Sequence, residues 1–169
     1  MVSRSKYAFR LNNVYYIYHL DWAGCPDKLG QWVVSELKSY NAESVMILKN
    51  DISRIRMSDI RYEFPKDETY TSLMYSAKNP RTAGLYEILA DCPPTTNVFV
   101  ENVYIIDLDH YMLELRCTNY TTCRDMIVSF PLHSIPDDWL QILYDSEDSE
   151  ISFENSETSS TRSRTILTC

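Results

Sequence analysis

Cys25 has the residue type and the position of a catalytic nucleophile. It stands just before Pro26, where the sequence predicts that a helix begins, and His19 and Asp21 precede it by a few residues. A cysteine hydrolase uses a thiolate, a histidine base and an acid that orients the histidine, and a helix N-terminus lowers the pKa of a thiol. His19 and Asp21 share one strand face, but nothing in the sequence brings that face against Cys25. A packing role for Cys25 is therefore favoured. If the protein is a cysteine hydrolase, the candidate catalytic residues are Cys25, His19 and Asp21.

A second candidate site is the segment from Asp107 to His110, which holds two carboxylates and an imidazole within four residues. Such groups can bind a divalent cation or exchange protons. Aspartate is also common in hairpin turns, because its side chain caps the local backbone, and this structural role is favoured here. The three histidines are widely spaced and no Cys-x-x-Cys pair exists, so no zinc-finger pattern is formed. The sequence predicts no metal and no cofactor.

Aromatic and turn-forming residues surround Cys25 and form the candidate binding surface. A tyrosine-rich strand ends here, a short Gly-Pro turn follows, and a helix begins. Tyrosine and tryptophan are enriched at interfaces, although core packing accounts for them almost as well. The predicted binding residues are Tyr18, Trp22, Gly24 and Pro26.

The same stretch resembles a known signature. Trp22-Ala23-Gly24-Cys25-Pro26, two further residues and Leu29-Gly30 are similar to the Trp-Asp-Gly-Tyr-Pro…Leu-Gly signature of small uncharacterised phage and microbial proteins, which also have a later strand like 103–107. Ala23 replaces the aspartate of that signature and Cys25 replaces its tyrosine, so the position of Cys25 need not hold a cysteine. The resemblance implies a related fold and no particular chemistry.

Alternating aromatic or apolar residues predict two hairpins and a further strand. The first hairpin turns at Asn12-Asn13, because asparagine tolerates a positive φ, and the second turns at residues 108–110. The predicted strands are 7–11, 14–20, 98–107, 111–117 and 126–132.

A helix is predicted from Pro26, because Leu29, Trp32, Val33 and Leu37 fall on one helical face. Proline suits the first helical position, where its missing N–H has no intrahelical partner in any case.

Two more helices are predicted at 82–91 and 136–144, the second with Ser134 as N-cap and Asp137 three residues later. The segment 43–64 fits either a strand or a helix. Strands near both ends of the chain with helices between them indicate an α+β protein, in which about three helices pack on a mostly antiparallel sheet.

The chain is predicted to form a single compact domain over residues 1–144. From residue 145 onward serine, glutamate, aspartate and threonine dominate. Such a segment buries too little apolar surface to offset its chain entropy, so residues 145–169 are predicted to be a disordered acidic tail.

The overall charge and apolar pattern restrict the partners. The formal net charge is −8, and an acidic surface repels the phosphate backbone of nucleic acids. No stretch approaches the roughly 20 apolar residues of a membrane span, and the N-terminus lacks the apolar run of a signal peptide. Five cysteines, an odd number, without a secretion signal favour free thiols. The sequence therefore predicts an intracellular, cytoplasmic protein that binds neither membrane nor nucleic acid.

Three functions follow in order of preference. The first is a non-enzymatic binding module that recognises a protein partner or a small ligand through its aromatic surface. The alternative is a cysteine-dependent or metal-assisted hydrolase that uses Cys25 or the 107–110 region. Nucleic-acid binding ranks third, because it requires Arg54, Arg56 and Arg61 to join other bases on one face.

Overall fold

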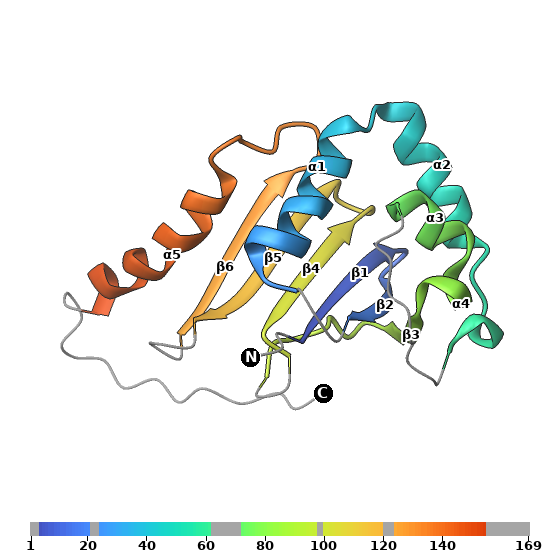
Figure 1. Ribbon diagram of the computed structural model, residues 1–169, viewed down its shortest axis with the longest axis horizontal. Coiled ribbons are helices and arrows are strands. Elements are labelled where there is room, and N and C mark those ends of the chain that lie inside the picture. The colour runs from blue at the N-terminus through green and yellow to red at the C-terminus, as the bar shows by residue number, and fades with distance from the viewer. Residues whose placement is uncertain (1–3, 21–23, 62–71, 98–99, 120–123, 155–169) are drawn as a thin grey trace.

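The computed structural model describes residues 4–20, 24–61, 72–97, 100–119 and 124–154. These residues form a six-stranded sheet with helices packed on one face (Figure 1). The strands are β1 (Ser5–Leu11), β2 (Val14–Leu20), β3 (Leu85–Ala90), β4 (Asn102–Asp107), β5 (Met112–Asn119) and β6 (Arg124–Pro131). The longer helices are α1 (Gln31–Ser39), α2 (Ala42–Ser53) and α5 (Trp139–Glu154). The shorter ones are η1 (Pro26–Gly30), η2 (Met57–Asp59), α3 (Leu73–Lys78) and α4 (Pro80–Ala83).

The sheet consists of two antiparallel halves joined by one parallel pair. Its strand order is β3-β2-β1-β4-β5-β6, and only β1 and β4 run parallel. Each half is a meander, and the connection from β3 to β4 carries the chain from one half to the other. The predicted α+β class, with helices packed on a mostly antiparallel sheet, is confirmed. About three helices were predicted, and the described residues form three longer helices and four short ones. The parallel pair at the centre was not predicted.

The predicted Asn12-Asn13 hairpin is confirmed. Leu11 pairs with Val14, and the two asparagines between them have φ values of 52° and 60°. Positive φ at both central residues gives a turn whose twist matches that of the flanking strands.

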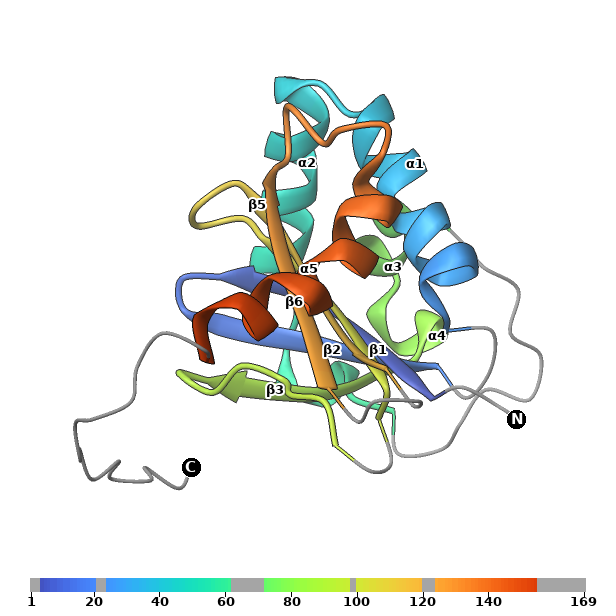
Figure 2. The ribbon, with the colours of Figure 1, turned by 90° about the vertical axis from the view of Figure 1, so that its left-hand side faces the viewer.

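The two faces of the sheet are covered differently. The helical face holds the main core, in which Tyr7 stacks on Tyr18 with ring centroids 4.8 Å apart. Figure 2 shows α1 and α3 on this side of the strands, and Trp139 and Leu143 of α5 belong to the same core. The opposite face has a smaller cluster built from β1, β2 and β4, over which Val100 of the β3–β4 connection is buried. Strand residues that alternate along β1 and β2 therefore face separate cores.

The prediction of a helix at 82–91 is wrong. Residues 80–83 form only the short helix α4, Gly84 follows with φ 89°, and the chain continues as strand β3. A left-handed glycine ends a helix without the steric cost that a side chain adds. Pairing of β3 with β2 then satisfies the backbone hydrogen bonds of these residues as a strand.

The other helical predictions are partly confirmed. The helix from Pro26 begins with the π turn η1 and continues as α1. The ambiguous segment 43–64 begins within α2 and is helical up to Ser53. The last helix begins at Trp139 rather than 136 and continues to Glu154, so Ser134 is not its N-cap and its predicted end at 144 is wrong. The remainder of the predicted tail, 155–169, lies outside the described residues. No helix in the described segments is long and apolar enough to cross a lipid bilayer.

Candidate functional site

The sheet separates Cys25 from His19. Tyr18 and Leu20 belong to the core on the helical face, so His19, between them, points to the opposite face. There the His19 ring contacts the Tyr86 ring edge-on, at a centroid distance of 5.7 Å. Cys25 instead precedes η1 on the helical side. The structure therefore does not bring the candidate base to the candidate nucleophile, and Asp21 lies outside the described residues.

The surroundings of Cys25 do not activate its thiol. Burial raises the pKa of Cys25, and a hydrogen bond and negative charge from Asp27 raise it further. A nucleophilic cysteine needs the opposite shift, toward the thiolate. Among the described residues, neither the position of His19 nor the shift of the Cys25 pKa gives Cys25 the character of an attacking thiol.

The predicted binding residues of this turn are packed inside the protein. Tyr18 is fully buried and its hydroxyl donates to the Ser76 carbonyl oxygen at 2.8 Å. The Tyr104 hydroxyl donates to the Gly24 carbonyl oxygen, also at 2.8 Å. Gly24 and Pro26 are buried as well, and Trp22 lies outside the described residues. The bond to Gly24 holds the turn against the sheet, and the described members of this set are buried.

Asp107 and His110 form part of a network that fixes the turn between β4 and β5. The Asp107 carboxylate accepts from Arg10 Nη1 at 2.8 Å and from the backbone N–H groups of residues 109 and 110 at 2.9 and 3.0 Å. His110 Nδ1 lies 2.9 Å from the same carboxylate. Asp109 accepts from the backbone N–H groups of Asn12 and Asn13 at 2.6 and 2.9 Å.

These contacts occupy both carboxylates and leave the segment in a structural role. In the described part of the chain, no three histidine, cysteine or acidic side chains are arranged to hold a metal ion. The network ties the β4–β5 turn, residues 108–111, to the β1–β2 hairpin.

Asp107 is expected to make stability depend on pH. Burial alone raises its pKa, but hydrogen bonds from His110 and Arg10 outweigh burial and hold the pKa below its ordinary value. A carboxylate with a lowered folded pKa stabilises the protein fully above its unfolded pKa of about 3.9, and this contribution is lost as pH falls through the folded value. Asp107→Asn is therefore expected to cost about 1–3 kcal/mol of unfolding free energy at pH 7, and the difference from wild type should shrink below about pH 4. Urea unfolding at several pH values measures it.

The exposed Asp138 gives a matched control for Asp107. Asp138 directly precedes α5, so Asp138→Asn should cost at most about 1 kcal/mol at pH 7, the value of a negative charge at a helix N-terminus. An Asp107→Asn deficit that is the same at pH 7 and pH 2.5 would contradict the role assigned to the ionised carboxylate.

The fixed turn carries two side chains that face an apolar cleft. Leu108 is fully buried, and Tyr111 ends the turn with φ 56°. A positive φ is rare for a bulky residue and costs free energy. The Tyr111 carbonyl oxygen accepts from the Leu132 N–H at 2.9 Å, which holds this unusual backbone in place. The turn and residues 132–133 together form one wall of the cleft.

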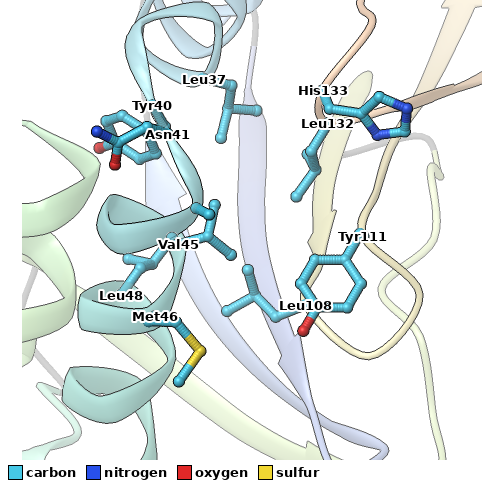
Figure 3. A pocket seen from close by; sticks show the side chains of 11 residues that line it. Leu37, Tyr40, Asn41, Val45, Met46, Leu48, Leu108, Tyr111, Leu132 and His133 are labelled. Atoms are coloured by element: carbon cyan, nitrogen blue, oxygen red, sulfur yellow. The ribbon is translucent and has the colours of Figure 1, made fainter.

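The opposite wall is the corner where α1 meets α2. Asn41 caps α2: its side-chain oxygen accepts from the Ser44 N–H at 2.8 Å, and the Ser44 hydroxyl accepts from the Asn41 N–H at 3.4 Å. This reciprocal capping box sets where the helix begins. It turns Val45 and Met46 toward the β4–β5 turn (Figure 3).

The cleft has a volume of about 400 Å³. Leu37, Leu48 and Leu108 are buried at its base. Met46 and Tyr111 stand at its mouth, with 55% and 45% of their surface exposed. The lining residues are Leu37, Tyr40, Asn41, Ala42, Val45, Met46, Leu48, Leu108, Tyr111, Leu132 and His133.

Few polar groups reach the cleft. The Asn41 side chain is engaged in capping α2, and the Tyr40 hydroxyl donates to Glu36 at 2.9 Å. His133 is exposed at the rim, and Lys49 Nζ donates to the Tyr111 hydroxyl oxygen at 3.0 Å. An apolar interior with a few polar groups at the edge is typical of small-molecule sites.

Sequence reasoning missed this cleft. Its walls come from residues 37–48 and 108–133, which no short motif connects. One signal was present: α2 buries Leu48 and Ile52, yet Met46, which lines the cleft, is also apolar and remains exposed. Large apolar residues outside the buried stripe of a helix indicate a second surface.

Of the three arginines at 54–61, Arg54 lies in a hollow that combines basic and acidic side chains. Arg54 and Lys78 line a common hollow of about 190 Å³ near the ends of α2 and α3. Asp51 and Asp59 line the same hollow, so the bases there are matched by an equal number of acids. This mixture gives no support to nucleic-acid binding.

No protein-family model, no curated protein and no solved structure shows a significant match to this chain.

Proposed function

We propose that the protein is a non-enzymatic binding module and that its ligand is a small, largely apolar molecule held in the cleft between α2 and the β4–β5 turn. The observation that carries this proposal is the cleft itself: about 400 Å³ lined almost entirely by apolar and aromatic side chains. Small-molecule sites occupy about 300–1,000 Å³ and have this kind of lining.

The arrangement of the walls also supports binding. Both walls are fixed before any ligand arrives, one by the capping box of α2 and the other by the Asp107 network. A preformed site loses less conformational freedom when it binds. Met46, an adaptable side chain at the mouth, can adjust to the shape of an apolar ligand.

The test is to fill the cleft from its exposed edge. Ala42 lines the cleft but is itself exposed at the start of α2, so Ala42→Trp places a large ring in the cleft without removing a core residue. The wild-type protein is expected to bind the neutral apolar dye N-phenyl-1-naphthylamine with a rise in fluorescence and one dye per chain. Ala42→Trp should weaken this binding at least about tenfold, because burial of apolar surface supplies its free energy.

Glu43→Trp is the matched control, since Glu43 is the next residue of α2, is exposed, and does not line the cleft. It should bind the dye as wild type does, and thermal unfolding should show that both variants are folded. Equal dye binding by the two tryptophan variants would place the dye elsewhere. An absence of dye binding to wild type would remove the support for a small apolar ligand.

A further inference from the structure

We propose that the ligand of the cleft is a small amphipathic carboxylate, with its apolar body between α2 and the β4–β5 turn and its carboxylate bound by Lys49 and Tyr111. This proposal rests on the proposed function and adds the charge and the orientation of the ligand.

Lys49 contacts Tyr111, which lines the cleft at its mouth. It follows Val45 and Met46 by four and three residues in α2, which places the three side chains on one helical face, and both of those residues line the cleft. Its Nζ lies 3.0 Å from the Tyr111 hydroxyl oxygen and 4.9 Å from the centroid of the Tyr111 ring. Figure 3 shows the Tyr111 ring beside Leu108, with its hydroxyl at the end of the cleft where Met46 lies.

Lys49 and Tyr111 together have N–H and O–H donors that no described acceptor uses. Lys49 uses one of its three N–H groups on Tyr111, and the Tyr111 oxygen, which accepts that bond, keeps its own proton to donate. Within the part of the chain that the structure describes, the two side chains have only each other as hydrogen-bond partners, and Lys49 pairs with no carboxylate. A ligand carboxylate can accept from both groups at once, and such charge-assisted bonds are stronger than neutral ones.

The two carboxylates at the β4–β5 turn are already engaged. Asp107 and Asp109 accept hydrogen bonds within the turn network. Lys49 is therefore a cation beside Tyr111 that forms an ion pair with none of the described acids. The protein has a formal net charge of −8 and repels anions overall. Lys49 provides a local positive charge that attracts the carboxylate of a ligand.

The volume of the cleft favours a small molecule. The base of the cleft is closed by Leu37, Leu48 and Leu108, and about 400 Å³ lies in the range that small ligands occupy. An alkyl or aryl carboxylate satisfies both parts of the site: its body contacts the leucines and its head group reaches Lys49 and Tyr111.

Octanoate and octanamide are the probes, because they share an alkyl chain and nearly the same head-group shape but differ in charge. Isothermal titration at pH 7.5 is expected to show octanoate binding about five- to tenfold more tightly than octanamide to wild type, since a partly exposed charge contributes modestly. Lys49→Met should remove this preference while leaving octanamide binding within about twofold of wild type. Tyr111→Phe, which removes only the hydroxyl, should reduce the preference.

Lys78→Met controls for the loss of one positive charge elsewhere, because Lys78 lines the separate hollow near α3. It should keep the full preference for octanoate. Added salt should weaken octanoate and leave octanamide unchanged.

The outcomes separate this proposal from the proposed function. Equal binding of octanoate and octanamide to wild type, or a preference that survives Lys49→Met, overturns the carboxylate proposal and leaves the apolar cleft standing. If neither probe binds and N-phenyl-1-naphthylamine also fails to bind, both proposals are overturned. If only the neutral dye binds, the proposal of an apolar binding cleft is supported and the proposal of a carboxylate ligand is rejected.

Discussion

Replacing Trp139 by alanine is expected to lower the free energy of unfolding by about 3–5 kcal/mol, the loss typical of a large aromatic removed from a packed core. Trp139 is only 2% exposed and begins α5. Its ring lies so close to Gly30 that a Cβ atom at that position would be 3.1 Å from it. Gly30 ends η1, so Trp139 joins the start of α5 to the end of η1.

Ile142 provides the control on the same helix. It lies three residues after Trp139 and is 36% exposed, so Ile142→Ala should cost about 1 kcal/mol or less. Urea unfolding followed by circular dichroism measures both variants. Limited proteolysis should also cut α5 faster in Trp139→Ala, because local opening becomes easier when the anchoring contact is lost. Equal losses of stability in the two variants would show that α5 is not anchored by Trp139.

Local sequence patterns predicted most of the strands because each depends on neighbouring residues. The Asn12-Asn13 turn and the alternation on either side of it specify one hairpin and its register. The strand register also fixes which residues share a face. His19 alternates with the buried Tyr18 and Leu20, so its separation from Cys25 follows from the period of a strand once the helical face is known.

Features set by distant contacts were not predictable in the same way. Residues 82–91 have no pattern that distinguishes a helix from a strand, and pairing with β2 together with the left-handed Gly84 decides the outcome. The parallel pairing of β1 and β4 joins residues almost a hundred positions apart. The cleft depends on that pairing, because it brings the β4–β5 turn beside the β1–β2 hairpin and holds Leu108 opposite α2.

The role of the segment around Cys25 also follows from packing. Tyr18, Gly24 and Pro26 have the residue types of a binding surface, yet they are buried against the sheet. Aromatic residues and glycines serve close packing as well as recognition, and the sequence alone does not distinguish the two uses. Substitution at Gly24 does distinguish them.

Gly24→Ala is expected to destabilise the protein by about 1–3 kcal/mol or more, the cost of forcing additional atoms into a packed site. A Cβ atom built at Gly24 would overlap both the Oγ and the Cβ of Ser5 in β1. Ser5 is fully buried, and its Oγ accepts from the Asn102 side chain at 3.3 Å. The Ser5 side chain therefore has no free space to move into. Thermal or urea unfolding of the folded variant measures the loss.

A second substitution separates overlap with Ser5 from other effects of the new methyl group. Ser5→Gly removes the two overlapping atoms and leaves the Ser5 Cα, which would lie 3.3 Å from the new Cβ. Ser5→Gly alone is expected to destabilise the protein, because it loses a buried hydrogen bond and adds backbone freedom to β1. In the double variant the two losses should not add: Gly24→Ala should cost about 1–3 kcal/mol less in the Ser5→Gly background than in wild type. Strict additivity of the two losses would mean that residue 24 does not lie against Ser5 of β1. A contact other than the one between Gly24 and Ser5 would then hold the start of η1 to the sheet.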